Sequence, residues 1–231
     1  MEEILRAGLA QLGLQDKGVP SLLRYAELLV EKNRVMNLTA ITDPADIARL
    51  HFLDSAALLT LTDLRGKTLV DVGTGAGFPG LPLRILEPSA QVTLLDSLGK
   101  RITFLQEVCT ELGLADVACI HGRAEEFCVQ HRETFDAAVS RAVASLPILA
   151  ELCLPLVKTG GVFIAMKSVD SGAELDGAGR AVSILGGRIA AVRDYTIPGT
   201  QIVHRAVLIE KVQPTPPKYP RAFAKIKKAP L

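Results

Sequence analysis

A chain of 231 residues, 48% of them hydrophobic, is long enough to bury the core of one large domain with an appendage. Tryptophan is absent and aromatic residues make up only 4%, which argues against an aromatic surface for stacking nucleic-acid bases. The net charge is +1, but all 25 acidic residues stand at or before Glu210, whereas six of the 26 basic residues follow it. An acidic body with a basic end is typical either of a protein with a polyanionic partner or of a solvated terminus.

The sequence shows no pattern for a metal site, a secretory signal or a membrane span. The cysteines form no C-x-x-C pair and no two histidines have ligand spacing. The first residues, Met-Glu-Glu-Ile-Leu-Arg, lack the basic and apolar regions of a signal peptide, and no apolar run approaches the length of a membrane helix. We therefore expect a cytoplasmic protein with reduced cysteines, no metal and no membrane contact. We also expect a monomer, although no sequence pattern reports the oligomeric state.

Residues 1–65 have the apolar spacing of helices. Apolar side chains recur three and four positions apart in the first dozen residues, and Pro20 opens a second helix. Asp43 can cap a third helix that has Pro44 at its first position. We expect an N-terminal helical extension, with an unusual density of polar side chains between residues 49 and 55.

The stretch from Leu69 to Gly80 predicts a buried strand, a glycine-rich turn and the start of a helix. Glycine accepts positive φ and lets a ligand approach the backbone closely, and Pro79 suits the first position of a helix. Asp71 places a carboxylate at the carboxyl end of the strand, where open α/β sheets bind ligands. The run from Gly75 to Gly80 matches G-x-G-x-x-G, a weak signal by itself because an ordinary tight turn also produces it.

From residue 67 onward, strand and helix patterns alternate, which predicts a parallel sheet with right-handed crossovers. The last two strands have only a short connection and should pair antiparallel. We therefore expect a doubly wound, seven-stranded α/β sheet over residues 66–212. The predicted strands are residues 68–72, 91–95, 117–120, 135–140, 161–166, 187–197 and 204–212, and the predicted helices are residues 78–86, 99–112, 146–156 and 168–186, with a loop at residues 121–127.

Residues 213–231 form a basic, proline-containing C-terminal tail. Such a segment cannot bury enough apolar surface to fold alone, so we expect it to be extended.

Polar residues follow the first four predicted strands and should meet at one edge of the sheet. Asp96 suits the hydroxyls of a ribose, and Glu125 or the backbone at Ala124 suits the edge of an adenine. Asp71 suits a cationic or amino group. No lysine follows the glycines, so the turn is not a P-loop. These residues predict a nucleoside site and leave the nucleoside open.

Six short runs, spread in order over most of the chain, form a joint pattern of high specificity. They are Asn37-Leu38-Thr39, residues 51–55, residues 71–80, residues 94–101, residues 123–127 and residues 140–145. In these runs the chain resembles the bacterial small-subunit ribosomal RNA methyltransferase G family, also called glucose-inhibited division protein B. Lys218-Tyr219-Pro220-Arg221 is similar to the family's C-terminal end, whereas residues 222–228 depart from the Gly/Pro-rich form expected there.

The resemblance implies methylation of guanine N7 in 16S ribosomal RNA, in a loop near the decoding region, with S-adenosylmethionine as the methyl donor. Free RNA and an assembled 30S subunit both stay open as the substrate. The family fold is a Rossmann-like methyltransferase sheet with an N-terminal helical extension, in agreement with the strand pattern. The cofactor site that it implies comprises Gly73, Phe78, Asp96, Ser97, Leu98, Ala124, Glu125 and Arg141, to which the strand and turn pattern adds Asp71 and Gly75.

Guanine N7 carries no proton, so we expect no general base among the catalytic residues. Arg141 and Lys167 are the cations nearest the predicted edge, and we expect them to orient RNA or cofactor groups. Further candidates for substrate binding are Asn37, Arg49, His51, Lys218 and Arg221.

Two alternatives use the same residues. An NAD-dependent oxidoreductase would need a catalytic acid–base and a second substrate domain, and the sequence shows neither. A non-catalytic RNA-binding module would have no need of the intact acids Asp71, Asp96 and Glu125.

Overall fold

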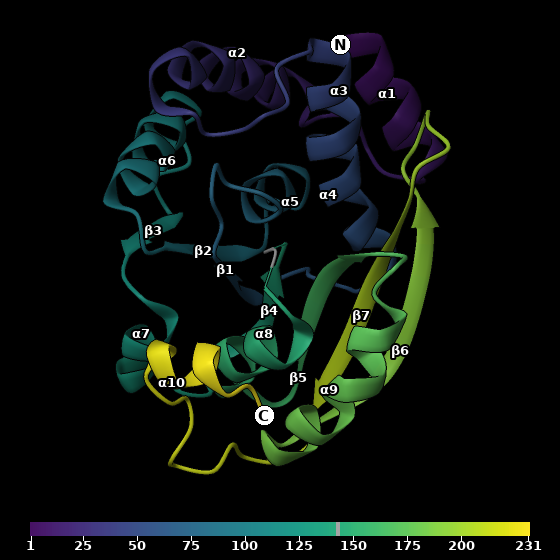
Figure 1. The fold of residues 1–231 in the computed structure, drawn as a ribbon. Coiled ribbons are helices and arrows are strands. Elements are labelled where there is room, and N and C mark those ends of the chain that lie inside the picture. The colour runs from purple at the N-terminus through teal and green to yellow at the C-terminus, as the bar shows by residue number, and fades with distance from the viewer. Residues whose placement is uncertain (142–143) are drawn as a thin grey trace.

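The computed structural model describes residues 1–141 and 144–231, whose strands form one seven-stranded sheet (Figure 1). Ala142 and Val143, which belong to the motif at residues 140–145, lie outside the described residues. The strands are β1 (Thr68–Val72), β2 (Gln91–Asp96), β3 (Ala118–His121), β4 (Phe135–Ser140), β5 (Val157–Ser168), β6 (Gly187–Thr196) and β7 (Val203–Lys211). Their order across the sheet is β3-β2-β1-β4-β5-β7-β6.

The direction of the strands confirms the predicted topology. Strands β1 to β5 pair in parallel, and β7 lies antiparallel between β5 and β6. The chain order reverses around β1, which pairs with β2 on one side and β4 on the other. In open α/β sheets, the crevice at such a reversal is where ligands bind.

Side chains alternate along the central strands between two cores, one on each side of the sheet. Leu69 joins one core and Val70 the other, and Leu94 and Leu95 divide in the same way. This period of two is the property of a strand, and both faces are apolar because helices cover both faces.

The helices divide between the two faces (Figure 1). The first face carries α1 (Glu2–Gln11), α2 (Val19–Met36), the helical residues 44–60, α5 (Gly80–Leu86) and α6 (Gly99–Glu111). The second face carries α7 (Ala124–His131), α8 (Leu146–Cys153) with the 3-10 turn η3 (Leu154–Leu156), α9 (Gly172–Ile184) and α10 (Phe223–Lys228). No helix of residues 1–141 and 144–231 is both long and apolar enough to cross a membrane.

The N-terminal helices pack directly on the sheet. Leu22 and Phe52 are completely buried in the same core as Leu94, and the hydroxyl of Tyr25 donates to the carbonyl of Ala76 in the glycine turn. The sheet and the extension therefore share one apolar interior. The domain boundaries after residues 65 and 212 stay predictions.

Residues 44–60 form one continuous helical stretch of changing pitch. It comprises α3 (Pro44–Asp46), the π-helical turn η1 (Ile47–Leu53), α4 (Asp54–Ala56) and the 3-10 turn η2 (Ala57–Thr60). The predicted cap is confirmed, since the Asp43 carboxylate accepts hydrogen bonds from the amides of Ala45 and Asp46. π-helical turns are rare and concentrate at functional sites, and this one contains Arg49 and His51.

The glycine turn needs its glycines. Gly73, Gly75 and Gly77 all have positive φ, at 73°, 62° and 104°, a region that other residues enter with strain. Helix α5 begins at Gly80, so Pro79 occupies the cap position and not the predicted first position of the helix.

Several predicted boundaries were wrong, and the helix predicted at residues 168–186, for example, covers only Gly172–Ile184. Residues 124–131 are helix α7 and not a loop, because two turns are too short for a clear apolar period. Strand β5 spans Val157–Ser168 and not residues 161–166, because Gly160 and Gly161 lie within the strand, next to an irregular pairing with β4. Strand β3 begins and ends one residue later than predicted.

The C-terminal tail is folded and not extended. Ile226 in α10 is completely buried and Tyr219 is nearly so, both in the core of the second face. Arg221 binds the buried carboxylate of Glu151 on α8 through its amide, Nε and Nη2, at 2.9, 2.8 and 2.6 Å. The tail gains this order from the rest of the protein, which a composition argument about the isolated segment cannot include.

Candidate functional site

A pocket of about 180 Å³ lies beyond the carboxyl ends of β1, β2 and β3. The predicted residues Gly73, Asp96, Ser97, Ala124 and Glu125 are all part of its wall. The other lining residues are Val72, Leu95, Gly122, Arg123, Leu152 and Phe223. The structure therefore brings together side chains that the sequence places on three separate strand ends.

Asp96 is the acid at the centre of this pocket. Its side chain is only 3% exposed, and Oδ2 accepts from the amide of Gly75 at 2.9 Å and from Arg101 Nη1 at 3.3 Å. Oδ1 accepts from the amide of Leu98 at 2.9 Å. Because each carboxylate oxygen has two lone pairs, Asp96 can hold the loop in place and still accept from a ligand hydroxyl.

Glu125 stands in the first turn of α7, on the neighbouring strand end. Its side chain is 12% exposed, and Oε1 accepts from Arg123 Nε at 2.7 Å. Glu125 is therefore a hydrogen-bond acceptor on the pocket wall. Leu98, also predicted for the site, is 43% exposed and is not among the residues that line the pocket.

Asp71 lies beneath the glycine turn and not on the pocket wall. Its Oδ2 accepts from Thr74 Oγ1 at 2.7 Å and from the amide of Gly80 at 2.8 Å. Complete burial raises the pKa of Asp71 to about 6, against the effect of these hydrogen bonds. Since the carboxylate is 0% exposed, its observed contacts serve to stabilise the glycine turn.

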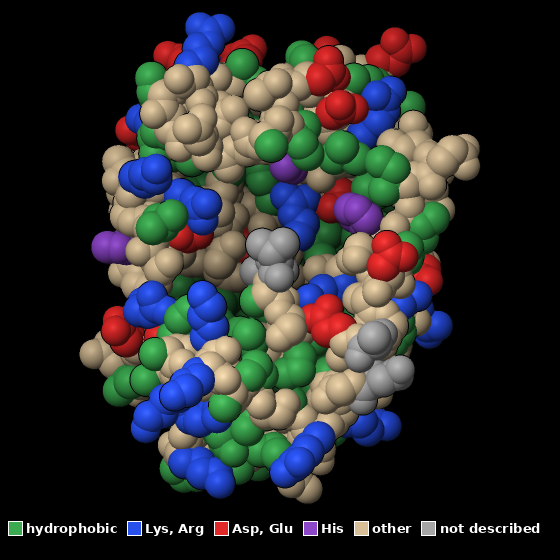
Figure 2. Space-filling view, viewed as in Figure 1, with side chains coloured by type: hydrophobic (Ala, Val, Ile, Leu, Met, Phe, Trp, Pro, Cys, Tyr) green, Lys and Arg blue, Asp and Glu red, His purple; other side chains and the backbone are tan. Residues whose placement is uncertain are grey.

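A second polar cluster, the Asp54 cluster, lies on the first face of the sheet. Asp54 is completely buried; Oδ1 accepts from Tyr195 Oη and from His204 Nδ1, each at 2.8 Å, and Oδ2 accepts from Arg141 Nη1 at 3.0 Å. Arg141 also donates to the carbonyl of Leu50 at 3.0 Å. Figure 2 shows acidic, basic and histidine side chains meeting in a hollow near the middle of the face drawn.

His51 joins the Asp54 cluster to the glycine turn. Arg141 Nη2 donates to its Nδ1 at 3.1 Å, and Thr39 Oγ1 lies 2.9 Å from its Nε2. The ring stacks on Phe78, with centroids 4.2 Å apart, and Phe78 is itself buried. Burial and the Arg141 charge lower the pKa of His51 to about 3, so the ring is neutral and Nδ1 is its acceptor.

The pKa values of His204 and Asp54 in this cluster are shifted as well. The hydrogen bond to Asp54 raises the pKa of His204 above its usual value. Burial alone would raise the pKa of Asp54, but the His204 hydrogen bond and the Arg141 charge hold it below the usual value. Asp54 is therefore the anion that gathers Arg141 and His204.

The predicted cations do not gather at one point. The side chain of Lys167 is only 8% exposed, and its Nζ lies 2.7 Å from both Glu174 Oε1 and the carbonyl of Ala144. Lys218 is exposed over the ring of Tyr219, and Arg221 is held by Glu151. Asn37 is exposed at the end of α2, and Arg49 lies partly buried in the π-helical turn.

Sequence reasoning gave no role to Asp54, Tyr195, His204 or Phe223. Asp54 stands in a motif that pointed to the family, three residues after His51. Tyr195 and His204 meet only because β6 and β7 pair with these two residues opposite each other. Tyr195 and His204 could therefore have been identified as partners only if the register of β6 and β7 had been known.

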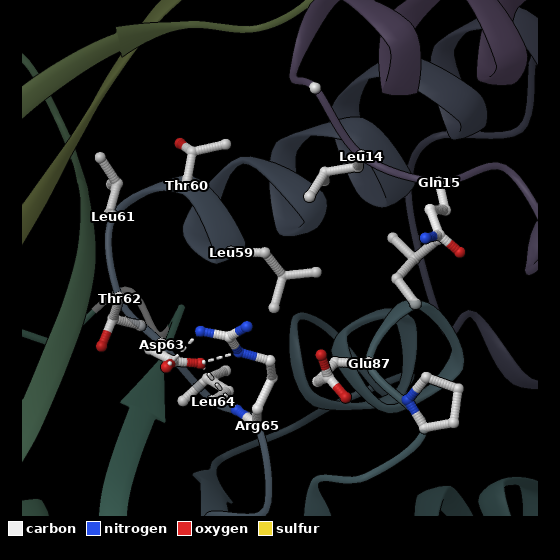
Figure 3. A pocket seen from close by; sticks show the side chains of 13 residues that line it. Leu14, Gln15, Leu59, Thr60, Leu61, Thr62, Asp63, Leu64, Arg65 and Glu87 are labelled. Carbon is white, nitrogen blue, oxygen red and sulfur yellow. Dashed lines mark hydrogen bonds and ion pairs between the residues drawn. The ribbon is translucent and has the colours of Figure 1, made fainter.

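A larger hollow, of about 670 Å³, lies elsewhere (Figure 3). Leu64, Arg65 and Glu87 line it, and Arg65 pairs with Asp63, two residues earlier on the same segment. These residues precede β1 and β2, so the hollow lies toward the amino ends of the strands, away from the edge where such sheets bind ligands. Among residues 1–141 and 144–231, no group of three or more His, Cys, Asp or Glu side chains could hold a metal.

The antiparallel β7 inside a parallel sheet, the glycine turn after β1 and the acid at the end of β2 define a Rossmann-like methyltransferase. Solved structures share this fold. The structure of M. jannaschii TYW2 in complex with AdoMet matches with a TM-score of 0.56 and 14% identity, over 69% of this chain and 75% of that chain. TrmN from Thermus thermophilus matches with a TM-score of 0.53 and 23% identity, over 68% of this chain and 48% of that chain.

The chain belongs to the family described as rRNA small subunit methyltransferase G, whose sequence profile matches residues 19–203. A relative of that name from Alkaliphilus metalliredigens is 47% identical, over 99% of this chain and 98% of its own length. Another, from Clostridium botulinum (strain ATCC 19397 / Type A), is 44% identical over 95% of this chain and 93% of its own length. The predicted family and enzyme class are confirmed, and the oxidoreductase alternative finds no support.

Proposed function

We propose that this methyltransferase transfers a methyl group from S-adenosylmethionine to N7 of a guanine in 16S ribosomal RNA, in a loop near the decoding region. The observation that carries the proposal is the pocket in which Asp96, Glu125 and the glycine turn meet. Membership of the rRNA small subunit methyltransferase G family supports the class of substrate.

The pocket fits the nucleoside half of the cofactor. Asp96 would accept from the ribose hydroxyls, while Glu125 and the backbone at Ala124 would hold the edge of the adenine. Gly73 and Gly75 leave room for the cofactor beside the turn. When bound, S-adenosylmethionine supplies an electrophilic methyl group on a sulfonium. A cavity of about 180 Å³ is below the roughly 300–1,000 Å³ of typical ligand pockets, which suits one part of the molecule.

The chain has no proton to remove in this reaction, because guanine N7 offers an in-plane lone pair. Its task is alignment, to which orientation alone can contribute several kcal/mol. Arg141, held by Asp54 and still 22% exposed, would orient an RNA phosphate, guanine O6 or a cofactor group. Lys167 would act more indirectly, through Glu174, by fixing the chain at the start of α8, whose Leu146 amide also donates to Glu174.

The substrate would be held from several sides. Asn37, Arg49 and His51 are proposed for the N-terminal side, and Lys218 for the C-terminal side. Arg221 is kept as a weaker candidate because Glu151 already binds it. We propose a monomeric, cytoplasmic enzyme that acts on 16S ribosomal RNA or on the 30S subunit.

Calorimetry and methyl transfer together test the proposal. The purified chain should bind S-adenosylmethionine and not NAD, and it should transfer a labelled methyl group to 16S ribosomal RNA or to 30S subunits that lack the modification. Mapping of the product should find 7-methylguanosine at one site. Binding of NAD alone would support the oxidoreductase, and RNA binding without cofactor binding would support the non-catalytic module.

A further inference from the structure

The C-terminal segment places an aromatic ring in the wall of the candidate cofactor pocket. Phe223, the first residue of α10, lines that pocket together with Asp96 and Glu125, although 98 residues separate it from Glu125 in sequence. Figure 1 shows α10 beside α7, the helix that carries Glu125. The predicted cofactor residues ended at Arg141, so this wall was not expected.

The position of Phe223 is fixed from both sides. Two residues earlier, Arg221 binds the buried carboxylate of Glu151, and three residues later, Ile226 is completely buried. Further back, Arg132 Nη1 donates to the carbonyl of Tyr219 at 2.7 Å. The ion pair of Arg221 with a buried carboxylate and the buried side chain of Ile226 therefore hold Phe223 in place in the pocket wall.

The surroundings of Phe223 suit a flat, uncharged base. The guanidinium carbon of Arg123 lies 4.5 Å from the ring centroid, and Arg123 is itself held by Glu125 at 2.7 Å. The remaining walls beside the ring include the apolar side chains of Leu95 and Leu152. The pocket wall thus has an acid for the edge of a base, together with an aromatic ring and aliphatic side chains. Since Arg123 covers one face of the ring, a base would stack against the other face.

We propose that the adenine of the cofactor stacks against Phe223, so that the C-terminal segment forms part of the S-adenosylmethionine site. This assignment rests on the proposed function. Bases stack on aromatic side chains because every base has a π face, and the stacking does not depend on which base is bound. It follows that the tail, until now assigned only to RNA, also sets the affinity for the methyl donor.

Tryptophan fluorescence gives a direct test, because the chain contains no tryptophan. Phe223→Trp creates a single fluorophore in the pocket, and its emission should be quenched as S-adenosylmethionine or S-adenosylhomocysteine is added. Val129→Trp is the matched control, since Val129 is 82% exposed on α7 and outside the pocket lining. Emission from the control should not change.

Phe223→Ala measures the size of the contact. We expect its affinity for S-adenosylmethionine, S-adenosylhomocysteine and adenosine to fall by about tenfold each, or about 1.4 kcal/mol, because all three ligands share the base. Phe223→Tyr should bind within about twofold of the parent, and thermal unfolding confirms that each variant is folded. If the parent binds S-adenosylmethionine, Phe223→Ala binds it equally well and the emission of Phe223→Trp does not change, the assignment is wrong. If the parent itself does not bind, the proposed function fails, and this assignment with it.

Discussion

Asp96 has two tasks at the scale of single residues, because it holds the Gly75 and Leu98 amides and faces the pocket. Losing a charged acceptor for two ribose hydroxyls should cost about 1.5–3 kcal/mol. We therefore expect Asp96→Ala to weaken S-adenosylmethionine binding by about tenfold or more in calorimetry. Asp116→Ala is the control, since that carboxylate is exposed and pairs with Arg84 away from the pocket lining. Equal affinity of both variants would remove Asp96 from the site.

Two histidines of the Asp54 cluster should give opposite dependences of stability on pH. The pKa of His51 is about 3 in the folded protein and about 6.5 in the unfolded protein. Between these two pH values the unfolded chain binds a proton at His51 that the folded chain does not bind. The free energy of unfolding should fall between pH 6.5 and 3, by at most about 1.4 kcal/mol per pH unit from this group. His51→Gln should lose that part of the slope.

His204 has the reverse sign, because its pKa is raised by Asp54. Its contribution to stability is fully present below pH 6.5 and is lost as the pH rises through its folded pKa. His204→Gln should therefore differ most from the parent protein at acid pH and least at alkaline pH. Urea unfolding of the parent and both variants across pH 4–9 measures how the free energy of unfolding depends on pH. If both variants show the same pH dependence as the parent, the pKa shifts inferred for the two histidines are wrong.

At the scale of elements, the first residue of α5 must be glycine, because Gly80 packs closely against β1 and β2. A Cβ on Gly80 would lie 2.8 Å from the Asp71 Cβ and 2.7 Å from a methyl group of Leu94. Overpacking of this kind costs about 1–3 kcal/mol, so Gly80→Ala should lower the urea midpoint. Gly179→Ala in α9 is the matched control. Nothing lies within 4 Å of its Cβ position, and we expect it to stabilise the protein by about 0.5–1 kcal/mol. Destabilisation by both variants would mean that glycine loss itself, and not the close contact, is responsible.

At the scale of the whole molecule, charge divides between an acidic body and a basic end. Lys211 is buried against the carbonyls of Leu154 and Val157, and Arg221 is paired with Glu151, so two of the six late cations cannot meet RNA freely. Four stay exposed: Lys218, Lys225, Lys227 and Lys228. Figure 2 shows Lys and Arg side chains gathered over the region of α7 and α10.

These four lysines should govern the salt dependence of RNA binding. Each phosphate contact contributes about −0.7 to −0.9 to the slope of log K against log salt. If three of the four engage, replacing all four by Gln should flatten the slope by roughly two to three units. Substitution is preferable to deletion, because deletion would expose the core around Ile226. Lys17→Gln with Lys67→Gln is the control, since both lysines are exposed and Lys67 directly precedes β1, at the opposite edge of the sheet. An equal slope in all three proteins would exclude the tail from the RNA surface.

The sequence by itself determined the sheet, its antiparallel strand and the acid-and-glycine pocket. These features are local: the period of a strand, the length of a connection and the residue that follows each strand all lie within a few positions of one another. Once β1, β2 and β3 were known to be parallel, Asp96 and Glu125 had to lie at the same edge. The motifs that identified the family are also local, since each is a short run of neighbouring residues.

Only the tertiary structure decided which charges are free and what closes the pocket. Asp54 meets Tyr195 and His204 across 141 and 150 residues, and Glu151 meets Arg221 across 70. Each of these contacts depends on strand register and helix packing, so no local pattern reports it. The tail shows the physical reason most plainly: alone it has too little apolar surface to fold, but it is ordered here because α8 offers a core for Ile226 and a buried carboxylate for Arg221.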